Sequence, residues 1–337
     1  MKNFRFEKKS DTDFTVLNLT DPQLGNGEWA EDAPNRKILE HTVKELMEGT
    51  HPDLVTVSGD LAWAGHDHAY DMLANLLDSY GVPWAPVWGN HDNQKGEEYI
   101  KSVAERYQKH PFCVYDDGPA EFGNGNYVIR ITENERTVCA LIMLDTHDRA
   151  PFVNQAGEAE NAWGKLRPCQ IEWVEAICQE LKNEGCTDAA LIQHIPIHGY
   201  RAASDAAYKE GIDHKALSVK QSEGDECWNE GYEDSVGVQH EGVASYPADE
   251  GAFAALKRTG IVSHVIAGHD HINNFIIRHE GIRMVYALKT GAGCYWDPAL
   301  NGGTVLKIGK NGISDVHHVY VTPPGSFSMK SITATAS

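Results

Sequence analysis

The chain has 337 residues, and its 29 Lys and Arg against 49 Asp and Glu give a formal net charge of −20 at pH 7. This charge repels nucleic acid and anionic membrane surfaces at long range, so we expect neither as a partner. The 41% hydrophobic content predicts a globular protein with a sizeable core, while the absence of a membrane-length apolar run and of a signal-peptide pattern predicts a cytoplasmic location.

Three strand, loop and helix units occupy the first third of the chain. Runs of apolar and β-branched residues predict strands over 14–20, 54–58 and 82–88. Apolar residues at helical spacing predict helices over 35–48 and 69–80. This alternation is typical of parallel strands in an α/β fold, whose ligands bind at the carboxyl ends of the strands.

The remaining elements mix strands with further helices. Helical spacing predicts helices over 97–109, 168–184 and 252–258. Strands are predicted over 126–131, 137–145, 189–193 and 264–267, and a closing run of antiparallel strands over 275–278, 283–288, 304–308 and 316–321. A charged turn separates 126–131 from 137–145, so we expect these two strands to pair antiparallel.

Between 195 and 247 the sequence loses its periodicity and becomes rich in Gly, Ser and acidic residues. A connection of this length predicts a lid, a binding loop or a mobile segment. Its aromatic and basic residues either contact an organic phosphate or only pack the loop onto the domain; they are His198, Tyr200, Arg201, Trp228, Tyr232 and His240. Since no linker or repeat divides the chain, we expect a single domain over 1–322, with this loop as an insertion and a loose tail over 323–337.

Side chains of the kinds that bind metals follow five of the predicted strands, at the point where each strand ends. They are Asp21 with Gln23, Asp60, Asn90 with His91, His194, and His269 with His271. Taken singly, an Asp at a strand end is more often a turn former, and a lone His is more often structural. Together, oxygen and imidazole donors at one edge of a sheet predict a centre for divalent metal ions.

The order of these motifs resembles that of the calcineurin-like metallophosphoesterase superfamily, from residue 14 to about residue 320. The matching blocks are Asp21-Pro22-Gln23, Gly59-Asp60, Gly89-Asn90-His91-Asp92, His194 and Gly268-His269-Asp270-His271. The first and last blocks look most like the atypical purple-acid-phosphatase-like (Dcr2-type) members. The resemblance implies a four-layer α/β/β/α sandwich of two mixed β-sheets flanked by helices, with a two-metal site at the edges of the sheets.

The resemblance also implies a role for each residue. One ion would be bound by Asp21, Asp60 and His271, and the other by Asp60, Asn90, His194 and His269. Mn, Fe or Zn ions suit such donors, and a pair of them activates the water that attacks phosphorus. His91 would donate a proton to the leaving alcohol, with Asp92 orienting its ring.

Two positions depart from the family pattern. Gln23 stands where the family has a histidine, and it either coordinates through its carbonyl oxygen or only hydrogen-bonds a metal-bound water. Trp63 stands where purple acid phosphatases have a tyrosine ligand. Because an indole offers no lone pair to a metal, we expect no purple iron chromophore.

The segment Gly65-His66-Asp67-His68 has the same letters as residues 268–271, but it opens a helix instead of ending a strand. We expect Asp67 to be the N-cap of that helix and both neighbouring histidines to be loop residues.

These motifs predict a metal-dependent phosphohydrolase with a small phosphorylated substrate. A phosphomonoester is favoured by the branch that the chain resembles, and a cyclic-nucleotide or other phosphodiesterase is the alternative within enzymes. An interaction scaffold that has kept the fold and lost turnover is a further alternative, which Gln23 permits. The sequence does not predict the oligomeric state.

Overall fold

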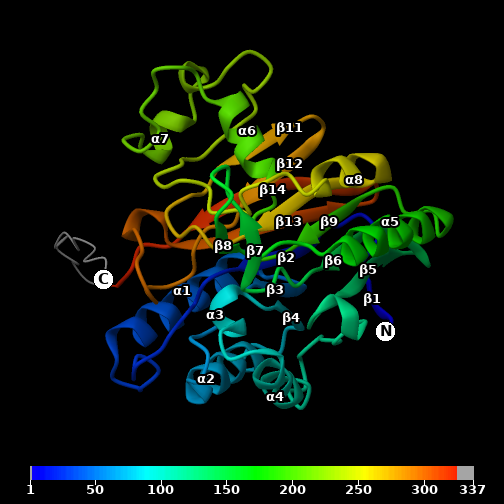
Figure 1. The fold of residues 1–337 in the computed structure, drawn as a ribbon. Coiled ribbons are helices and arrows are strands. Elements are labelled where there is room, and N and C mark those ends of the chain that lie inside the picture. The colour runs from blue at the N-terminus through cyan, green and yellow to red at the C-terminus, as the bar shows by residue number, and fades with distance from the viewer. Residues whose placement is uncertain (1, 325–337) are drawn as a thin grey trace.

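Two β-sheets face each other in the computed structural model, which describes residues 2–324, and helices cover their outer faces (Figure 1). The larger sheet has seven strands in the order β1-β5-β6-β9-β10-β12-β11. They span Phe4–Glu7 (β1), Tyr127–Glu133 (β5), Arg136–Met143 (β6), Ala189–Ile192 (β9), Val262–Ala267 (β10), Ile282–Tyr286 (β12) and Ile276–His279 (β11). β5 and β6 pair antiparallel, as predicted, whereas β6, β9, β10 and β12 are parallel neighbours.

The smaller sheet has five strands in the order β14-β13-β2-β3-β4. They span Gly312–Tyr320 (β14), Gly302–Gly309 (β13), Phe14–Leu19 (β2), Leu54–Ser58 (β3) and Trp84–Val87 (β4). β2, β3 and β4 are parallel, which confirms the prediction for the first third of the chain, and β13 pairs antiparallel with β2. Both sheets are therefore mixed.

Helices pack on the two outer faces. The helices span Pro34–Thr50 (α1), Asp67–Asp78 (α2), Asn90–Asn93 (α3), Glu97–Tyr107 (α4), Pro168–Asn183 (α5), Gly199–Ala207 (α6), Val219–Ser222 (α7) and Ala252–Thr259 (α8), with 3-10 turns at Ala120–Phe122, Asp225–Cys227 and Pro298–Leu300. α1, α2 and α4 share a core with the smaller sheet, and α5, α6 and α8 share one with the larger sheet. This arrangement confirms the expected four-layer sandwich.

Strand alternation explains why both faces of the larger sheet are buried. Ile129 and Leu141 belong to the core between the sheets, while Val128 and Ile142 belong to the core beneath the helices. Successive side chains of a strand point to opposite faces, so these strands read as continuous apolar runs.

Two parts of the fold differ from the prediction. The closing strands do not form one antiparallel run, because β12 pairs parallel with β10 and leaves β13 and β14 to the other sheet. A two-stranded hairpin, β7 (Arg149–Val153) and β8 (Ala159–Trp163), was not predicted, nor was β1. β8 has the sequence Ala-Glu-Asn-Ala-Trp, which lacks the β-branched residues that mark a strand.

The segment over 195–247 contains α6 and α7 and packs against the edge of the larger sheet near β11 (Figure 1). Tyr200 is fully buried, and its hydroxyl donates hydrogen bonds to the carbonyl oxygens of Val265 and Val285. Trp228 is also buried and donates to the carbonyl oxygen of Ser222. Tyr200 therefore attaches the segment to the larger sheet, and Trp228 holds parts of the segment together.

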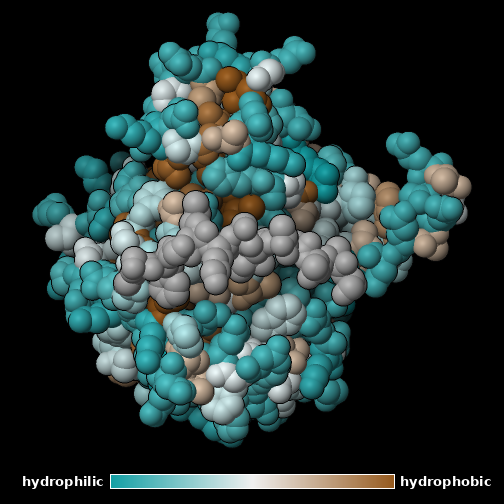
Figure 2. Space-filling model, turned by 90° about the vertical axis from the view of Figure 1, so that its left-hand side faces the viewer, coloured by the Kyte–Doolittle hydropathy of each residue, from teal (hydrophilic) through white to brown (hydrophobic). Residues whose placement is uncertain are grey.

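Hydrophilic residues cover most of the face shown in Figure 2, as expected for a chain of this charge. Within residues 2–324, none of the helices combines the length and the apolar character needed to cross a membrane. The predicted tail over 323–337 lies almost wholly outside the described residues.

Candidate metal centre

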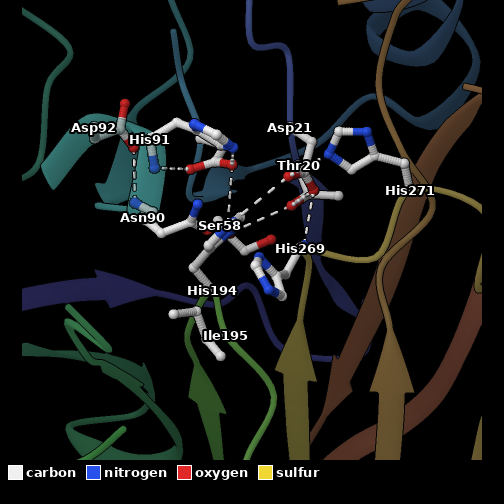
Figure 3. Close-up of polar contacts among 12 residues, drawn as sticks. Thr20, Asp21, Ser58, Asn90, His91, Asp92, His194, Ile195, His269 and His271 are labelled. Atoms are coloured by element: carbon white, nitrogen blue, oxygen red, sulfur yellow. Dashed lines mark hydrogen bonds and ion pairs between the residues drawn. The ribbon is translucent and has the colours of Figure 1, made fainter. Parts of the chain in front are cut away.

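The candidate metal centre lies where strands of both sheets end. Asp21 follows β2, Asp60 follows β3 and His194 follows β9 closely. Each of these buried residues offers one ligand atom, and the three atoms lie within 4.8 Å of one another. His269 and His271 follow β10, and Figure 3 shows their rings beside Asp21 and His194. The fold thus brings together five residues that lie up to 250 positions apart in the sequence.

Asp21 is held between the ends of β2 and β10. Its Oδ2 atom accepts hydrogen bonds from the Thr20 hydroxyl at 2.7 Å and from the backbone N–H of His269 at 3.1 Å. Its Oδ1 atom lies 3.3 Å from Nε2 of His271 and 3.9 Å from Nε2 of His194. One carboxylate oxygen is therefore fixed by the protein, and the other faces two imidazole nitrogens.

Asp60 has a similar arrangement on the other side of the centre. Its Oδ1 atom accepts a hydrogen bond from the backbone N–H of His91 at 2.9 Å, and its Oδ2 atom lies 3.3 Å from Nε2 of His194. Oδ1 of Asn90 lies 3.1 Å from the same nitrogen of His194. Asp60, Asn90 and His194 therefore form a compact set of donors.

Backbone carbonyl groups orient two of the imidazole rings. Nδ1 of His194 lies 2.9 Å from the carbonyl oxygen of Ser58, and Nδ1 of His271 lies 2.8 Å from that of Tyr295. A carbonyl oxygen can only accept, so each Nδ1 is the donor and each Nε2 is directed into the centre. This second hydrogen bond is the usual way in which proteins orient a metal-binding histidine.

Four residues of the centre have the left-handed backbone conformation. They are Asp21 (φ 53°), Gln23 (φ 46°), Asp60 (φ 49°) and His269 (φ 80°). This conformation is uncommon for residues other than glycine, and it persists where the surrounding structure enforces it, often at functional sites.

Two motif glycines allow the donors to approach the backbone closely. A Cβ atom on Gly89 would overlap the carboxylate of Asp60, and a Cβ atom on Gly59 (φ +94°) would overlap the ring of His194. Glycine at both positions is therefore a steric requirement of the centre.

Charges in the centre balance one another. Burial alone would raise the pKa values of Asp21 and Asp60, but His194 and its neighbours outweigh this effect and hold both below the usual value. Burial would likewise lower the pKa of His194, but Asp60 and Asp21 raise it to about 10. Burial, reinforced by His194, lowers the pKa of His269 to about 3. A metal ion bound here would replace the proton on His194.

Unpartnered polar atoms test whether these residues fit a metal ion. Among the described residues, the buried atoms without a hydrogen-bond partner include Oδ1 of Asp21, Nε2 of His269 and both amide atoms of Gln23. Leaving a buried polar atom unpaired costs about 1–3 kcal/mol. Asp21 and His269 belong to the same cluster, and a divalent ion would give these two atoms a partner. The residues present therefore fit a metal centre.

Gln23 and Lys289 lie beside the Asp21 half of the centre. The side chain of Gln23 is fully buried, and its backbone N–H donates to the carbonyl oxygen of Asp60 at 3.0 Å. Lys289 is also buried, and its Nζ donates to the carbonyl oxygen of Asp21 at 2.6 Å. Burial lowers the pKa of Lys289, although Asp21 partly offsets this effect. The sequence analysis missed this lysine, which follows β12 as the other site residues follow their strands.

His91 lies at the exposed side of the centre, with 23% of its side chain accessible. Its Nε2 is 4.0 Å from Oδ2 of Asp60. The amide of Gln94 lies 2.8 Å from Nδ1, and the ring of Trp63 packs at 4.1 Å between centroids. Trp63 therefore packs against His91. The sequence analysis missed Gln94, although its position three residues after His91, at helical spacing, is a signal that could have found it.

Asp92 does not have the expected contact. Its carboxylate accepts hydrogen bonds from the backbone N–H of Gly89 and the hydroxyl of Tyr70, both at 2.7 Å, and from two further backbone N–H groups at 3.3 Å. Among the described residues, the side chain within hydrogen-bonding distance of Nδ1 of His91 is that of Gln94. The expectation that Asp92 orients His91 is therefore wrong. The side chain of Asp92 is buried, and its hydrogen bonds connect the loop that follows β3 with the loop that follows β4.

The segment 65–68 lies apart from the cluster, as its context indicated, but two details differ. His66 occupies the N-cap position of α2, and Asp67 is the first helical residue, with no capping hydrogen bond. Asp67 instead accepts a hydrogen bond from the hydroxyl of Tyr99 at 2.7 Å. His68 lies within α2, where its ring packs against Trp29.

The motifs of the centre match a known family over most of the chain. A family model described as calcineurin-like phosphoesterase matches residues 14–273. The chain belongs to this family. The family is described as one of phosphoesterases, in agreement with the class of enzyme that the motifs predict.

Individual relatives agree with this membership. The chain is 25% identical over 327 residues to Phosphatase DCR2 of Saccharomyces cerevisiae, covering 90% of this chain and 52% of the relative, so it spans about half the length of that protein. It is 23% identical over 340 residues to the probable inactive purple acid phosphatase 28 of Arabidopsis thaliana, covering 88% and 75%. The crystal structure of a dimetal phosphatase from Danio rerio has the same fold, with a TM-score of 0.53 at 13% identity, covering 92% of this chain and 99% of that one.

Proposed function

We propose that the chain is a metal-dependent phosphohydrolase that cleaves phosphomonoesters. The observation that carries the proposal is the convergence of Asp21, Asp60 and His194 within 4.8 Å in a chain of this family. One metal ion would be held by Asp21, Asp60 and His271, with Gln23 nearby, and a second by Asp60, Asn90, His194 and His269. Mn, Fe or Zn ions suit this mixture of oxygen and imidazole donors.

When bound, such ions would polarise the phosphoryl group and lower the pKa of a water molecule that attacks it. The residues of the chain supply orientation and a proton. Backbone carbonyl groups fix the rings of His194 and His271, and two N–H donors fix the carboxylates of Asp21 and Asp60. His91 stands at the accessible side of this cluster, where its Nε2 can give a proton to the leaving alcohol.

A phosphomonoester is proposed because the relatives with the longest matches are named phosphatases. A phosphodiesterase would use the same centre. The net charge of −20 supports a small phosphorylated substrate over nucleic acid or an anionic membrane. A cytoplasmic location remains part of the proposal.

A second candidate is a metal-binding scaffold without turnover. It is favoured by two observations: Gln23 replaces a family histidine, and three relatives from Arabidopsis thaliana are named as probably inactive. The complete set of Asn90, His91, His194, His269 and His271 supports catalysis instead.

Elemental analysis of the purified protein, combined with hydrolysis assays in added Mn²⁺, tests these proposals. A monoester and a diester of the same phenol are compared. We expect at least one metal ion per chain and faster cleavage of the monoester. Faster cleavage of the diester would favour a phosphodiesterase, and bound metal without hydrolysis of either would favour the scaffold.

A further inference from the structure

The hairpin of β7 and β8 stands beside the metal centre, near the middle of the view in Figure 1. Arg149 and Trp163 are paired at its base, where the two strands begin and end. The ring of Trp163 meets the ring of His269 edge to face, with 4.5 Å between centroids and 83° between planes. The hairpin therefore contacts the centre through a proposed metal ligand.

Arg149 lies on the face of Trp163. The central carbon of its guanidinium is 3.7 Å from the centroid of the indole, a close cation–π contact. Its one ion-pair partner in the described residues is the adjacent Asp148, with Nε 3.6 Å from Oδ1, beyond hydrogen-bonding distance. By contrast, Arg130 makes hydrogen bonds of 3.0–3.2 Å with Glu184. The guanidinium of Arg149 thus keeps donors available while its position is fixed.

A second cation is held to the same hairpin in the same way. Nζ of Lys165 lies 3.8 Å from the ring centroid of Tyr246. Tyr246 is attached to β7, since its hydroxyl donates to the carbonyl oxygen of Pro151 at 2.9 Å and its ring packs on Phe152. In a chain of net charge −20, the hairpin thus holds two cations over aromatic rings, among the carboxylates of Asp148, Glu158 and Glu160.

We propose that Arg149 binds a second anionic group of the substrate, so that the chain prefers phosphate esters whose alcohol also bears a phosphate or a carboxylate. This inference rests on the proposed function. The transferred phosphoryl group belongs among the ligands of the centre, and the indole of Trp163 contacts both Arg149 and His269. The guanidinium is not itself one of these ligands, and its link to the centre through Trp163 suits contact with the next group of the substrate.

The chemistry of the side chain suits this role. A guanidinium presents parallel N–H donors that match two oxygens of a phosphate or carboxylate, and the stacked indole removes the cost of ordering it. The net charge of the chain would otherwise disfavour a substrate with additional negative charge. Arg149 supplies a cation that offsets this effect.

Paired substrates test the proposal. The probes are the monophosphates and bisphosphates of straight-chain α,ω-diols of increasing length, assayed with the Mn²⁺-loaded protein. We expect the bisphosphate of at least one length to have a kcat/KM roughly tenfold above that of its monophosphate, since a charge-assisted contact to phosphate is among the stronger polar interactions. In Arg149→Gln the kcat/KM values of the two substrates should become about equal, and Arg149→Lys should keep part of the preference for the bisphosphate.

Arg258→Gln is the matched control, because it removes one positive charge from an exposed side chain on α8 whose partner is Glu175 at 2.9 Å. It should leave the ratio unchanged. Equal kcat/KM for mono- and bisphosphates at every length, in an active enzyme, would overturn the role of Arg149 and leave the proposed function intact.

A binding measurement makes the test independent of turnover. Calorimetry with the corresponding mono- and bisphosphonates should show tighter binding of a bisphosphonate by the wild type, and no such preference in Arg149→Gln. Absence of the preference in the wild type would overturn the inference even if the chain hydrolyses nothing, whereas absence of all hydrolysis with the preference intact would count against the proposed function alone.

Discussion

Gln94 donates a hydrogen bond from its side-chain amide to Nδ1 of His91 at 2.8 Å. With Nδ1 as the acceptor, a neutral His91 ring carries its proton on Nε2, the atom on the side of Asp60. A group that is to protonate a leaving alcohol needs its proton on the nitrogen that faces the reaction. The contact with Gln94 therefore fixes the direction of Nε2, and the protonated ring, with the amide of Gln94 turned so that its oxygen accepts from Nδ1, is the form that can act as general acid.

Replacing His91 with Ala should spare metal content and lower turnover of a phosphomonoester by about 10²-fold or more, the usual contribution of general acid catalysis. Steady-state kinetics beside elemental analysis would measure both effects. The effect should shrink for a substrate with an acidic leaving phenol, which needs no proton. Unchanged turnover with a poor leaving group would remove the proposed role.

Gln94→Leu should lower kcat by roughly tenfold, because the ring of His91 loses the contact that orients it, at a cost near that of one hydrogen bond. KM and metal content should stay close to those of the wild type. Gln179→Leu on α5, where the native amide donates to Asn183 at 3.2 Å on an exposed face, is the control and should have no effect on kcat. A kcat for Gln94→Leu equal to that of the control would contradict the prediction.

Gln23→His should increase the affinity of the Asp21 half of the centre for Mn²⁺ or Zn²⁺, because an imidazole is a stronger ligand than a neutral amide for these ions. Isothermal titration of the metal-free protein would show a second binding event that is tighter than in the wild type. Gln23→Leu, which removes the unpartnered amide, should weaken the same event or leave it unchanged. Identical titrations for wild type and Gln23→His would show that position 23 does not reach the ion.

Asp92→Ala should lower the free energy of unfolding by about 3 kcal/mol, because it leaves the buried N–H of Gly89 without its acceptor and leaves the hydroxyl of Tyr70 with only the carbonyl oxygen of Ala62, at 3.2 Å. Urea denaturation would measure the loss. Tyr70→Phe, which removes one of these hydrogen bonds, should cost only about 1 kcal/mol. If Asp92→Ala were as stable as the wild type, the structural role assigned to this carboxylate would be incorrect.

His264→Gln should make the protein less sensitive to acid. Burial, reinforced by Arg283, lowers the pKa of His264 from 6.5 to about 3. Below pH 6.5 this histidine binds a proton in the unfolded chain but not in the folded chain. The contribution of His264 to the free energy of unfolding is therefore fully present above pH 6.5 and falls by about 1.4 kcal/mol per pH unit toward pH 3. Glutamine does not titrate, so the stability difference between variant and wild type should change with pH in this window. A difference that is independent of pH would contradict the prediction.

Local patterns were sufficient for most of the fold. The apolar runs at β2, β3 and β4 and the helical spacing of α1 and α2 predicted the parallel units, because these elements are buried on a regular face. The same patterns placed Asp21, Asp60 and His194 at strand ends, and parallel strands bring their carboxyl ends to one edge.

Contacts between distant residues decided the rest. The residues around Asp92 in the sequence do not show that its carboxylate accepts a hydrogen bond from Tyr70 and not from His91. The direction of this side chain depends on how α3 packs in the folded protein. The assignment of β11 and β12 to one sheet and β13 and β14 to the other depends on pairing partners far along the chain.

The candidate ligands were thus named from the sequence, and their surroundings were determined by the tertiary structure. Strand ends are local features, so Asp21, Asp60 and the histidines could be recognised from motif order alone. Arg149 and Trp163 occur in a polar segment without periodicity, and they gain a role only because the hairpin folds over the end of β10 and sets the indole against His269. A cation–π contact and an edge-to-face ring pair leave no periodic pattern in the chain, so only the three-dimensional structure reveals them.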